Sequence, residues 1–331
     1  MNINRLFSNL LRKTSKVFSV PIEYFQDLIL FAIFNHNSPF AAKANKISYK
    51  LIIHAHAIEK GLSLPNPRPM FGRFHIETIC SLVDTYDCSC DPFPVAMALG
   101  SLEEYIRFNI ESGHNPQDLI DLDKYVKTKL QEWRIAPSGG TKLITKTRLE
   151  LAKDSKQYNE FLTSRFSCRF FSDEKISDEV IANIIKVATS APSQCNRQST
   201  RLHYFRDPLK ISQLLSLQGG SRGFSDNVPN LLIASFDLTG WANASQRNQG
   251  YVDAALLSMV IMYAFHSMGV ASCPLNLALT NADERTIRSC AGIPAHERLV
   301  MMIAFGYPSK ECSRSARSER ISVKTLLSFH D

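Results

Sequence analysis

Three polar side chains recur at alternate positions in the segment Ser164–Arg169. Arg165, Ser167 and Arg169 stand at i, i+2 and i+4, so in an extended chain they point to the same side. Guanidinium groups bind phosphate through paired hydrogen bonds, and a hydroxyl group adds a shorter one. The spacing therefore indicates a phosphate site, although a solvated basic loop would show the same pattern.

A second polar cluster lies in the segment Ala191–Gln198, between an expected helix and an expected strand. Ser193, Gln194, Asn196 and Gln198 place hydroxyl and amide groups close together. Amide side chains both donate and accept hydrogen bonds, which suits the alternating carbonyl and N–H groups of an isoalloxazine or pyrimidine edge. An ordinary polar loop that precedes a strand is the alternative.

Two further segments can serve the same ligand. Gly269–Asn276 combines a glycine, small residues and Pro274, a composition that lets the backbone approach a flat molecule closely. A plain helix-to-strand turn is the alternative for this segment. In the C-terminal tail, Arg314, Arg317 and Arg320 recur every three residues, and a solvated basic tail is the alternative there.

Sequence motifs for several other chemistries are missing. The chain has no GxGxxG or GxxxxGK[ST] loop, no HExxH and no GxSxG. His54 and His56 stand at i, i+2 on an expected helix, where the two rings point apart, and we interpret them as structural. Asp237 and Asp253 have no carboxylate partner at a useful spacing. We therefore expect no metal site and no catalytic side chain.

Composition and charge indicate a globular protein. The 331 residues are 44% hydrophobic and 21% charged, which is enough for a real core and about two domains. The net charge of +7 is spread widely, unlike the concentrated basic face of a nucleic-acid-binding protein. Eight cysteines without a CxxC pair, and no signal peptide at the N-terminus, predict reduced thiols in a cytoplasmic protein.

The second half of the chain must supply the elements that position these residues. No right-handed βαβ repeat is visible, which favours a layered α+β fold over a doubly wound one. Asn248–Met268 is apolar on nearly every side, as in a central helix or a subunit interface. We expect helices from a Ser177 cap to about Ala191 and at Pro208–Leu217, Asn248–Met268 and Asp283–Cys290, and strands at Arg201–Phe205, Asn230–Phe236, Val270–Pro274 and Leu299–Gly306.

The first half of the chain is expected to be mostly helical. The pattern predicts helices at Ala41–Ile58, Ile76–Tyr86, Val95–Ser112 and Leu119–Trp133. Pro137–Gly140 is the clearest linker signal, within a boundary region that we place at 137–157. We therefore divide the chain into a helical N-terminal region of unassigned role, residues 1–150, and a second domain, residues 151–331.

The N-terminus offers two interpretations. Tyr24–Phe34 is an apolar stretch that contains Asp27, and Arg5, Arg12, Lys13 and Lys16 precede it. A basic amphipathic segment can rest on a membrane surface, but no apolar run reaches the roughly 18 residues of a membrane-spanning helix. Because Asp27 interrupts the stretch, we favour a helix that packs on the protein's own core.

Taken in order, four of these segments resemble the nitroreductase family. The family element R-x-S-x-R-x-F reads Arg165–Phe171, and its A-P-S-x-x-N-x-Q element reads Ala191–Gln198. The long apolar helix runs into G-x-x-S-C-P at Gly269–Pro274, and G-Y-P at Gly306–Pro308 precedes the basic tail. The resemblance covers roughly the last 175 residues. His56–Leu62 also looks like a segment of nitroreductase-like proteins from bacterial surface-polysaccharide gene clusters.

The resemblance implies a layered fold with a central, mainly antiparallel sheet flanked by helices, and a homodimer with FMN at the subunit interface. It places phosphate and ribityl contacts at Arg165, Ser167 and Arg169. It also implies flavin contacts at Ser193, Asn196 and Gln198, backbone approach at Pro274, Leu275 and Asn276, and a return to the phosphate by Arg317 and Arg320. Phe166 departs from the pattern, since many members carry a second basic residue there.

The implied activity is hydride transfer from NAD(P)H through flavin N5 to a small electron-poor acceptor, such as a quinone, a nitro compound or an enone. The cofactor carries this chemistry, which agrees with the lack of an evident catalytic side chain. The alternative is a non-catalytic flavin-fold scaffold or assembly protein in bacterial envelope polysaccharide synthesis, motivated by the long N-terminal region.

Overall fold

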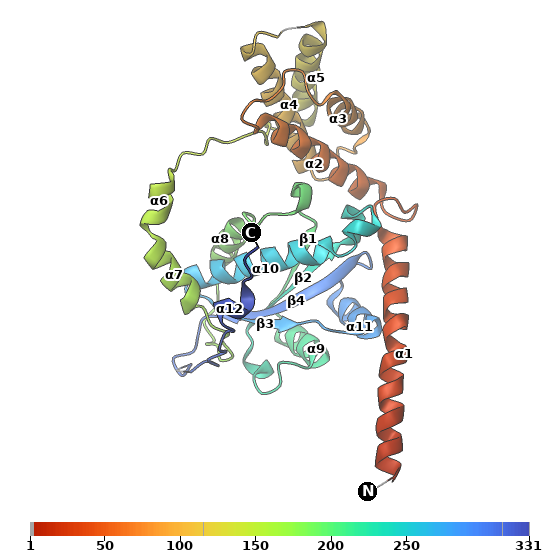
Figure 1. Cartoon of the computed structure of the whole chain (residues 1–331), viewed down its shortest axis with the longest axis vertical. Helices are drawn as coiled ribbons and strands as arrows, with labels where there is room; N and C mark the ends of the chain where they lie inside the picture. Colours follow the sequence, from red (N-terminus) through yellow and green to blue (C-terminus); the bar gives the residue numbers. More distant parts are fainter. Residues whose placement is uncertain (1–2, 115, 313, 331) are drawn as a thin grey trace.

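A four-stranded antiparallel sheet lies at the centre of the C-terminal half of the chain (Figure 1). The computed structural model describes residues 3–114, 116–312 and 314–330. The strand order is β1-β2-β4-β3, so that β2 and β4 are inner strands and β1 and β3 are edges. The strands are β1 (Thr200–Phe205), β2 (Asn230–Asp237), β3 (Ala271–Asn276) and β4 (Glu297–Gly306).

The inner strands are buried on both faces, which explains why their apolar runs do not alternate with polar residues. Every residue of β2 is buried. Its register with β4 runs from Asn230 opposite Phe305 to Asp237 opposite Glu297, with one irregularity after Ala234. The expected strands are therefore present, and the ends of each lie within two residues of the predicted range.

Helices cover both faces of the sheet. Leu232 and Ile303 pack toward α8 and α10, whereas Leu231, Ile233 and Ala304 pack toward α9 and α11, as the alternation of side chains along a strand requires. These helices are α8 (Asp178–Ala188), α9 (Pro208–Gln218), α10 (Gln249–Ser267) and α11 (Asn281–Ala291). The predicted layered α+β fold is confirmed.

The N-terminal helices form a separate bundle with its own core above the sheet (Figure 1). Leu51, Ile79, Leu99 and Leu102 are fully buried in that core. The bundle consists of α2 (Lys43–Leu62), α3 (Arg73–Thr85), α4 (Phe93–Glu111) and α5 (Gln117–Trp133). A long first helix, α1 (Ile3–Phe34), runs down the side of the sheet domain near α11 and projects beyond it (Figure 1). No helix of the described residues is long and apolar enough to cross a membrane.

The connection between the two parts differs from the predicted linker. Ser138–Gly140 packs on the bundle, where Ser138 N donates to Ala96 O at 3.0 Å and Gly140 N donates to Glu59 Oε1 at 3.0 Å. A side chain at Gly100 would collide with the Ser138 carbonyl group, so glycine is required for this approach. The exposed segment 142–147 then runs from the helical bundle to the next helix of the chain (Figure 1).

Two short helices follow within the region predicted as a boundary. Thr147 and Glu150 form a capping box that starts α6 (Arg148–Lys153), and α7 (Ser155–Ser164) comes next. The predicted domain boundary at residue 150 falls inside α6. The remaining short helices are η1 (Gln194–Asn196), η2 (Ser225–Asn227), η3 (Leu238–Gly240), η4 (Ala244–Gln246) and α12 (Val323–Leu326).

Candidate cofactor site

The first group of predicted residues lies along the outer edge of β3. Ser167 forms a parallel bridge with Ser272, and Cys168 N donates to Ser272 O at 3.0 Å. Further on, Ser172 N donates to Tyr307 O at 2.8 Å. These backbone bonds hold the segment extended beside the sheet, so alternate side chains share one side.

Ser167 and Arg169 line an open pocket of about 390 Å³. Two more guanidinium groups, from Arg222 and Arg314, line the same pocket together with the carboxylate of Glu311. Three cationic side chains facing one acidic side chain form a pocket suited to an anionic group such as a phosphate. Arg222 was not predicted, because it lies after α9 with no sequence pattern to connect it to the other residues.

The tail reaches this pocket through a different arginine from those predicted. Arg314 lines the pocket, whereas Arg317 forms an ion pair with Glu319 at 2.6 Å and Arg320 Nη1 donates to Ser318 O at 2.7 Å. The sequence offered three equivalent arginines at a three-residue spacing. Only the path of the tail after β4 distinguishes between them.

The surroundings of Arg165 indicate whether a cofactor phosphate fits at this edge. Its Nη1 atom is buried and has no hydrogen-bond partner among the described residues. A buried donor without an acceptor costs free energy, and a phosphate oxygen would be a suitable acceptor. Burial, followed by the charge of the Arg165 guanidinium group, lowers the pKa of the neighbouring His266. The residues at this edge therefore fit an anionic ligand.

The second group of predicted residues forms a tight loop before β1. Ser193 Oγ accepts from Gln198 N at 3.1 Å, and Gln198 Nε2 donates to Asn196 Oδ1 at 3.2 Å. Cys195, Asn196 and Gln198 have positive φ angles of 53°, 53° and 52°. Such angles are strained for residues other than glycine and cluster at functional sites. The structure thus brings Ser193, Asn196 and Gln198 together.

Two buried charged side chains support this loop. Asp253 accepts from Gln194 N at 3.0 Å and from Gln249 Nε2 at 2.9 Å. Arg197 stacks on the Trp241 ring at 4.9 Å, and burial lowers the pKa of its guanidinium group. Sequence reasoning missed both roles, although the i, i+4 spacing of Gln249 and Asp253 on a helix was a usable signal. A pocket of about 270 Å³ beside the loop is lined by Ser193, Gln198 and Asp253, among others.

The two groups lie at opposite edges of the sheet. Pro274, Leu275 and Asn276 belong to β3, and the segment 165–169 lies along its outer edge, whereas the 193–198 loop leads into β1. Three strand spacings of about 4.8 Å separate the axes of these two edge strands by roughly 14 Å, and helices cover the sheet between them. One protomer therefore does not place all predicted residues around one small ligand.

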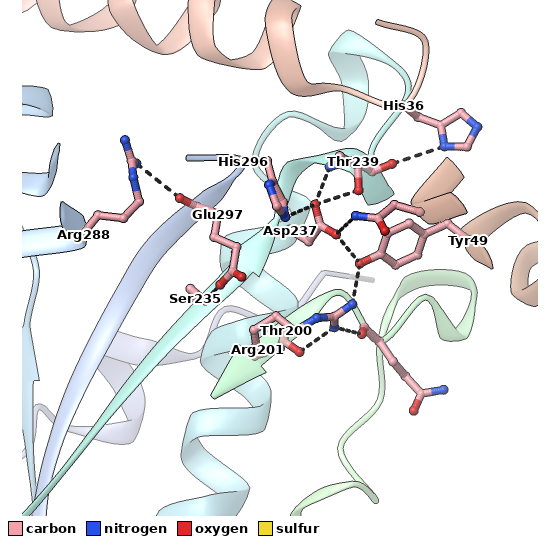
Figure 2. A network of polar contacts seen from close by, with 12 residues as sticks. His36, Tyr49, Thr200, Arg201, Ser235, Asp237, Thr239, Arg288, His296 and Glu297 are labelled. Atoms are coloured by element: carbon pink, nitrogen blue, oxygen red, sulfur yellow. Dashed lines mark hydrogen bonds and ion pairs between the residues drawn. The ribbon is translucent and has the colours of Figure 1, made fainter. Parts of the chain in front are cut away.

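A buried polar network joins the helical bundle to the sheet beside the loop (Figure 2). Tyr49 of α2 donates to Asp237 Oδ2 at 3.0 Å, and Arg201 Nη2 donates to the Tyr49 hydroxyl at 3.0 Å. Thr239 donates to the other oxygen of Asp237 through both its amide and its hydroxyl group. Burial, followed by the charge of Asp237, raises the pKa of Tyr49 well above its ordinary value. Tyr49 therefore remains protonated and acts as a fixed donor.

The network and the bundle also contact the loop directly. Arg201 Nη1 donates to Gln198 O at 3.0 Å, and Asn196 Nδ2 lies 3.8 Å from Met97 Sδ of α4. The helical region thus supports the same loop that carries the predicted flavin contacts. Among the described residues, no group of three or more His, Cys, Asp or Glu side chains is placed to hold a metal ion.

Comparison with known proteins identifies the family of one part of the chain. The model of the nitroreductase family matches residues 162–219 and 212–307. These residues form a nitroreductase-family domain. The match includes the β3 edge, the 193–198 loop and the whole sheet, and it leaves the helical bundle and the basic tail outside.

Several proteins are similar to the nitroreductase domain. Human iodotyrosine deiodinase 1 is 26% identical over 195 residues, which cover 50% of this chain and 65% of the human one. The chain thus spans less than two thirds of that relative. A putative NADH dehydrogenase/NAD(P)H nitroreductase of Archaeoglobus fulgidus is 27% identical over 156 residues, covering 46% of this chain and 86% of the other. A solved FMN-dependent nitroreductase from Clostridium difficile has a TM-score of 0.45 and 21% identity, covering 52% of this chain and 99% of that one.

Proposed function

We propose that the chain is an FMN-dependent oxidoreductase that uses NAD(P)H to reduce a small electron-poor acceptor. The observation that carries the proposal is the buried Nη1 atom of Arg165, which has no partner in the described chain and lies in the segment that lines a pocket with three other arginines. Membership of residues 162–307 in the nitroreductase family supports the same conclusion.

Each group of residues has a role in binding. Arg165, Ser167 and Arg169 would hold the FMN phosphate, and Arg314 would close this site from the tail because it lines the pocket. Ser193, Asn196 and Gln198 would present donors and acceptors to the flavin edge. The backbone at Pro274–Asn276 would approach the ring from the open edge of β3.

The chemistry that FMN supplies when bound is hydride transfer from reduced nicotinamide, through N5, to an acceptor such as a quinone, a nitro compound or an enone. The protein's own contribution is to bind and orient. Asp253 holds the 193–198 loop at Gln194 and Arg201 holds it at Gln198, so its amide groups are fixed before the ligand arrives.

The position of the two groups at opposite edges favours a homodimer. In a twofold dimer, the β3 edge of one chain can meet the 193–198 loop of its partner, and each site is then formed twice. The outward side of α10 offers Val252 and Leu256, which are exposed apolar residues one helical turn apart. We propose that this side of α10 packs against the partner subunit.

A second candidate acceptor follows from the similarity to iodotyrosine deiodinases. These relatives are named for removing iodine from a phenol, so a halogenated tyrosine is a reasonable acceptor class to test beside the quinone, nitro compound and enone. The 26% identity over half of this chain supports testing it but does not favour it over the other three.

An absorption spectrum of the purified full-length chain tests the proposal. We expect a flavin spectrum, with or without prior incubation with FMN, that bleaches when NADH or NADPH is added without oxygen. The flavin absorbance should then return when an acceptor is added, and it should return faster with one class of acceptor than with the others. A protein that stays colourless after incubation with FMN would contradict flavin binding. A yellow protein that neither nicotinamide bleaches would instead support the non-catalytic scaffold in polysaccharide synthesis.

A further inference from the structure

Helix α1 is attached to the sheet domain by one side. Glu23 accepts from Asn281 N at 2.7 Å, and Asp27 forms an ion pair with Arg298 at 3.0 Å. Phe31 and Phe34 pack against the cluster around Trp241. These residues recur every three or four positions and so form one stripe of the helix. The attachment fixes the direction in which the rest of α1 projects (Figure 1).

The other side of α1 is apolar and open. Tyr24, Phe25 and Leu28 expose 73%, 62% and 60% of their surface, and Ile29 exposes 40%. These four residues stand at i, i+1, i+4 and i+5, so they form a second stripe of the helix beside the attachment stripe. Tyr24 and Leu28 also line a pocket with Asp27 and Phe31. A continuous apolar patch of this kind on a protein surface indicates a binding surface for another molecule or a membrane.

The sequence before this stripe shows the same pattern. Apolar pairs recur at Leu6–Phe7, Leu10–Leu11 and Val17–Phe18, in helical phase with Tyr24–Phe25 and Leu28–Ile29. The side chains before Ser19 lie outside the described part of the chain, so this is a property of the sequence alone.

Charge indicates which partner this surface fits. The first 22 residues contain four basic residues, Arg5, Arg12, Lys13 and Lys16, and no Asp or Glu. The two acidic residues of α1, Glu23 and Asp27, are both engaged with the sheet domain. The sequence of α1 before Glu23 therefore carries only positive charges. A second copy of α1 would bring like charges together, whereas a surface of anionic phospholipid is attracted to them.

We propose that α1 is a membrane-surface helix that binds anionic lipid bilayers. Its apolar stripe enters the boundary between headgroups and acyl chains, its basic residues contact lipid phosphates, and its attachment stripe holds the sheet domain at the membrane. Aromatic side chains such as Tyr24 and Phe25 suit this depth, and tyrosine in particular is enriched at membrane interfaces. The proposal revises our expectation that α1 only packs on the protein itself, since the structure shows that one side packs and the other does not.

Co-sedimentation with vesicles tests the proposal on the full-length chain. We expect binding to phosphatidylcholine vesicles that contain about one third phosphatidylglycerol, weaker binding to phosphatidylcholine alone, and a marked loss at about 0.5 M salt. Phe25→Glu with Leu28→Glu should lower the apparent partition coefficient at least about tenfold, because both apolar contacts are replaced by anionic groups. Arg12→Glu with Lys13→Glu should remove the preference for anionic vesicles.

The matched control is Leu209→Glu with Leu217→Glu, which makes the same change at two exposed leucines of α9 and should leave binding unchanged. Leu28→Gln is a milder second variant, and its thermal unfolding should match that of the unaltered chain. Three results would overturn the proposal: no sedimentation with either vesicle at low salt, equal losses in the control pair, or a lipid-independent oligomer that Phe25→Glu with Leu28→Glu dissociates. The last result would assign the stripe to a second copy of the chain.

Discussion

Arg165 differs from Arg169, Arg222 and Arg314 because one of its nitrogen atoms is buried and has no acceptor among the described residues. Hydrogen bonds to charged groups contribute about 1.5–3 kcal/mol each. Arg165→Ala together with Arg169→Ala should therefore weaken FMN binding by at least about a hundredfold, and the double variant should purify largely without flavin. Equilibrium titration with FMN, followed by flavin fluorescence, measures the dissociation constant.

Arg317→Ala together with Arg320→Ala is the matched control. It also removes two positive charges, from a part of the tail in which Arg317 pairs with Glu319 and Arg320 donates to Ser318. We expect wild-type affinity for this control. A loss as large as that of the first pair would contradict our assignment of the tail contact to Arg314.

For individual site residues, the sequence predicted those that are close together in the chain and missed those that are distant in the chain but close in the fold. The alternation of Arg165, Ser167 and Arg169 needs only an extended segment, and the pairing with β3 provides it. Arg222 reaches the same pocket from the loop after α9. No local pattern marks that residue, because its position depends on how α9 packs under the sheet.

At the scale of elements, the hydroxyl group of Tyr49 links α2 to β2. Tyr49→Phe removes a hydrogen bond to the buried Asp237 carboxylate and one from Arg201. We expect the free energy of unfolding in urea to fall by about 1.5–3 kcal/mol, since the carboxylate loses a donor while remaining buried. Tyr158→Phe, at an exposed tyrosine of α7, should change it by less than about 0.5 kcal/mol. Equal effects would show that the network contributes nothing specific.

The helical bundle contains a histidine whose titration should affect its stability. Burial, followed by the charges of His75 and Lys50, lowers the pKa of His54 to about 4, whereas an unfolded histidine titrates near 6.5. Between these values the unfolded chain binds more protons than the folded one, so stability increases with pH. The thermal midpoint should therefore fall as pH is lowered from about 6.5 to about 4, with the stabilisation fully present above that window.

His54→Gln should flatten this dependence, and His114→Gln, at an exposed loop position, should leave it unchanged. A slope that His54→Gln does not alter would assign the pH dependence to other groups.

The elements of the sheet domain were predictable because their signals are local. Ser177 does cap α8 by accepting from Val180 N, and the apolar run of β2 reflects burial on both faces. The Pro-Ser-Gly-Gly segment is a loop in the connection between α5 and α6, but it also packs on the bundle. Its contact with α4 depends on the missing side chain of Gly100, which is a tertiary effect that composition does not reveal.

At the scale of the whole molecule, we expect a dimer. Val252→Glu together with Leu256→Glu places two charges on the outward side of α10 and should produce a monomer of 37.3 kDa, whereas the unaltered chain should have twice that mass by light scattering. Burying unpaired carboxylates in an interface is strongly unfavourable. The Leu209→Glu and Leu217→Glu pair should remain dimeric. A monomeric wild-type chain that binds FMN stoichiometrically would contradict the proposal.

The separation of the two groups of residues at opposite sheet edges also has a genetic consequence. Chains carrying Arg165→Ala and Arg169→Ala are defective at one edge, and chains carrying Asn196→Ala and Gln198→Ala are defective at the other. In a mixed dimer, both defects fall in one of the two sites, and the other site is assembled entirely from intact edges. Two inactive alleles expressed together should therefore complement each other. Random pairing makes half of the dimers mixed, so about one quarter of the wild-type flavin sites should return.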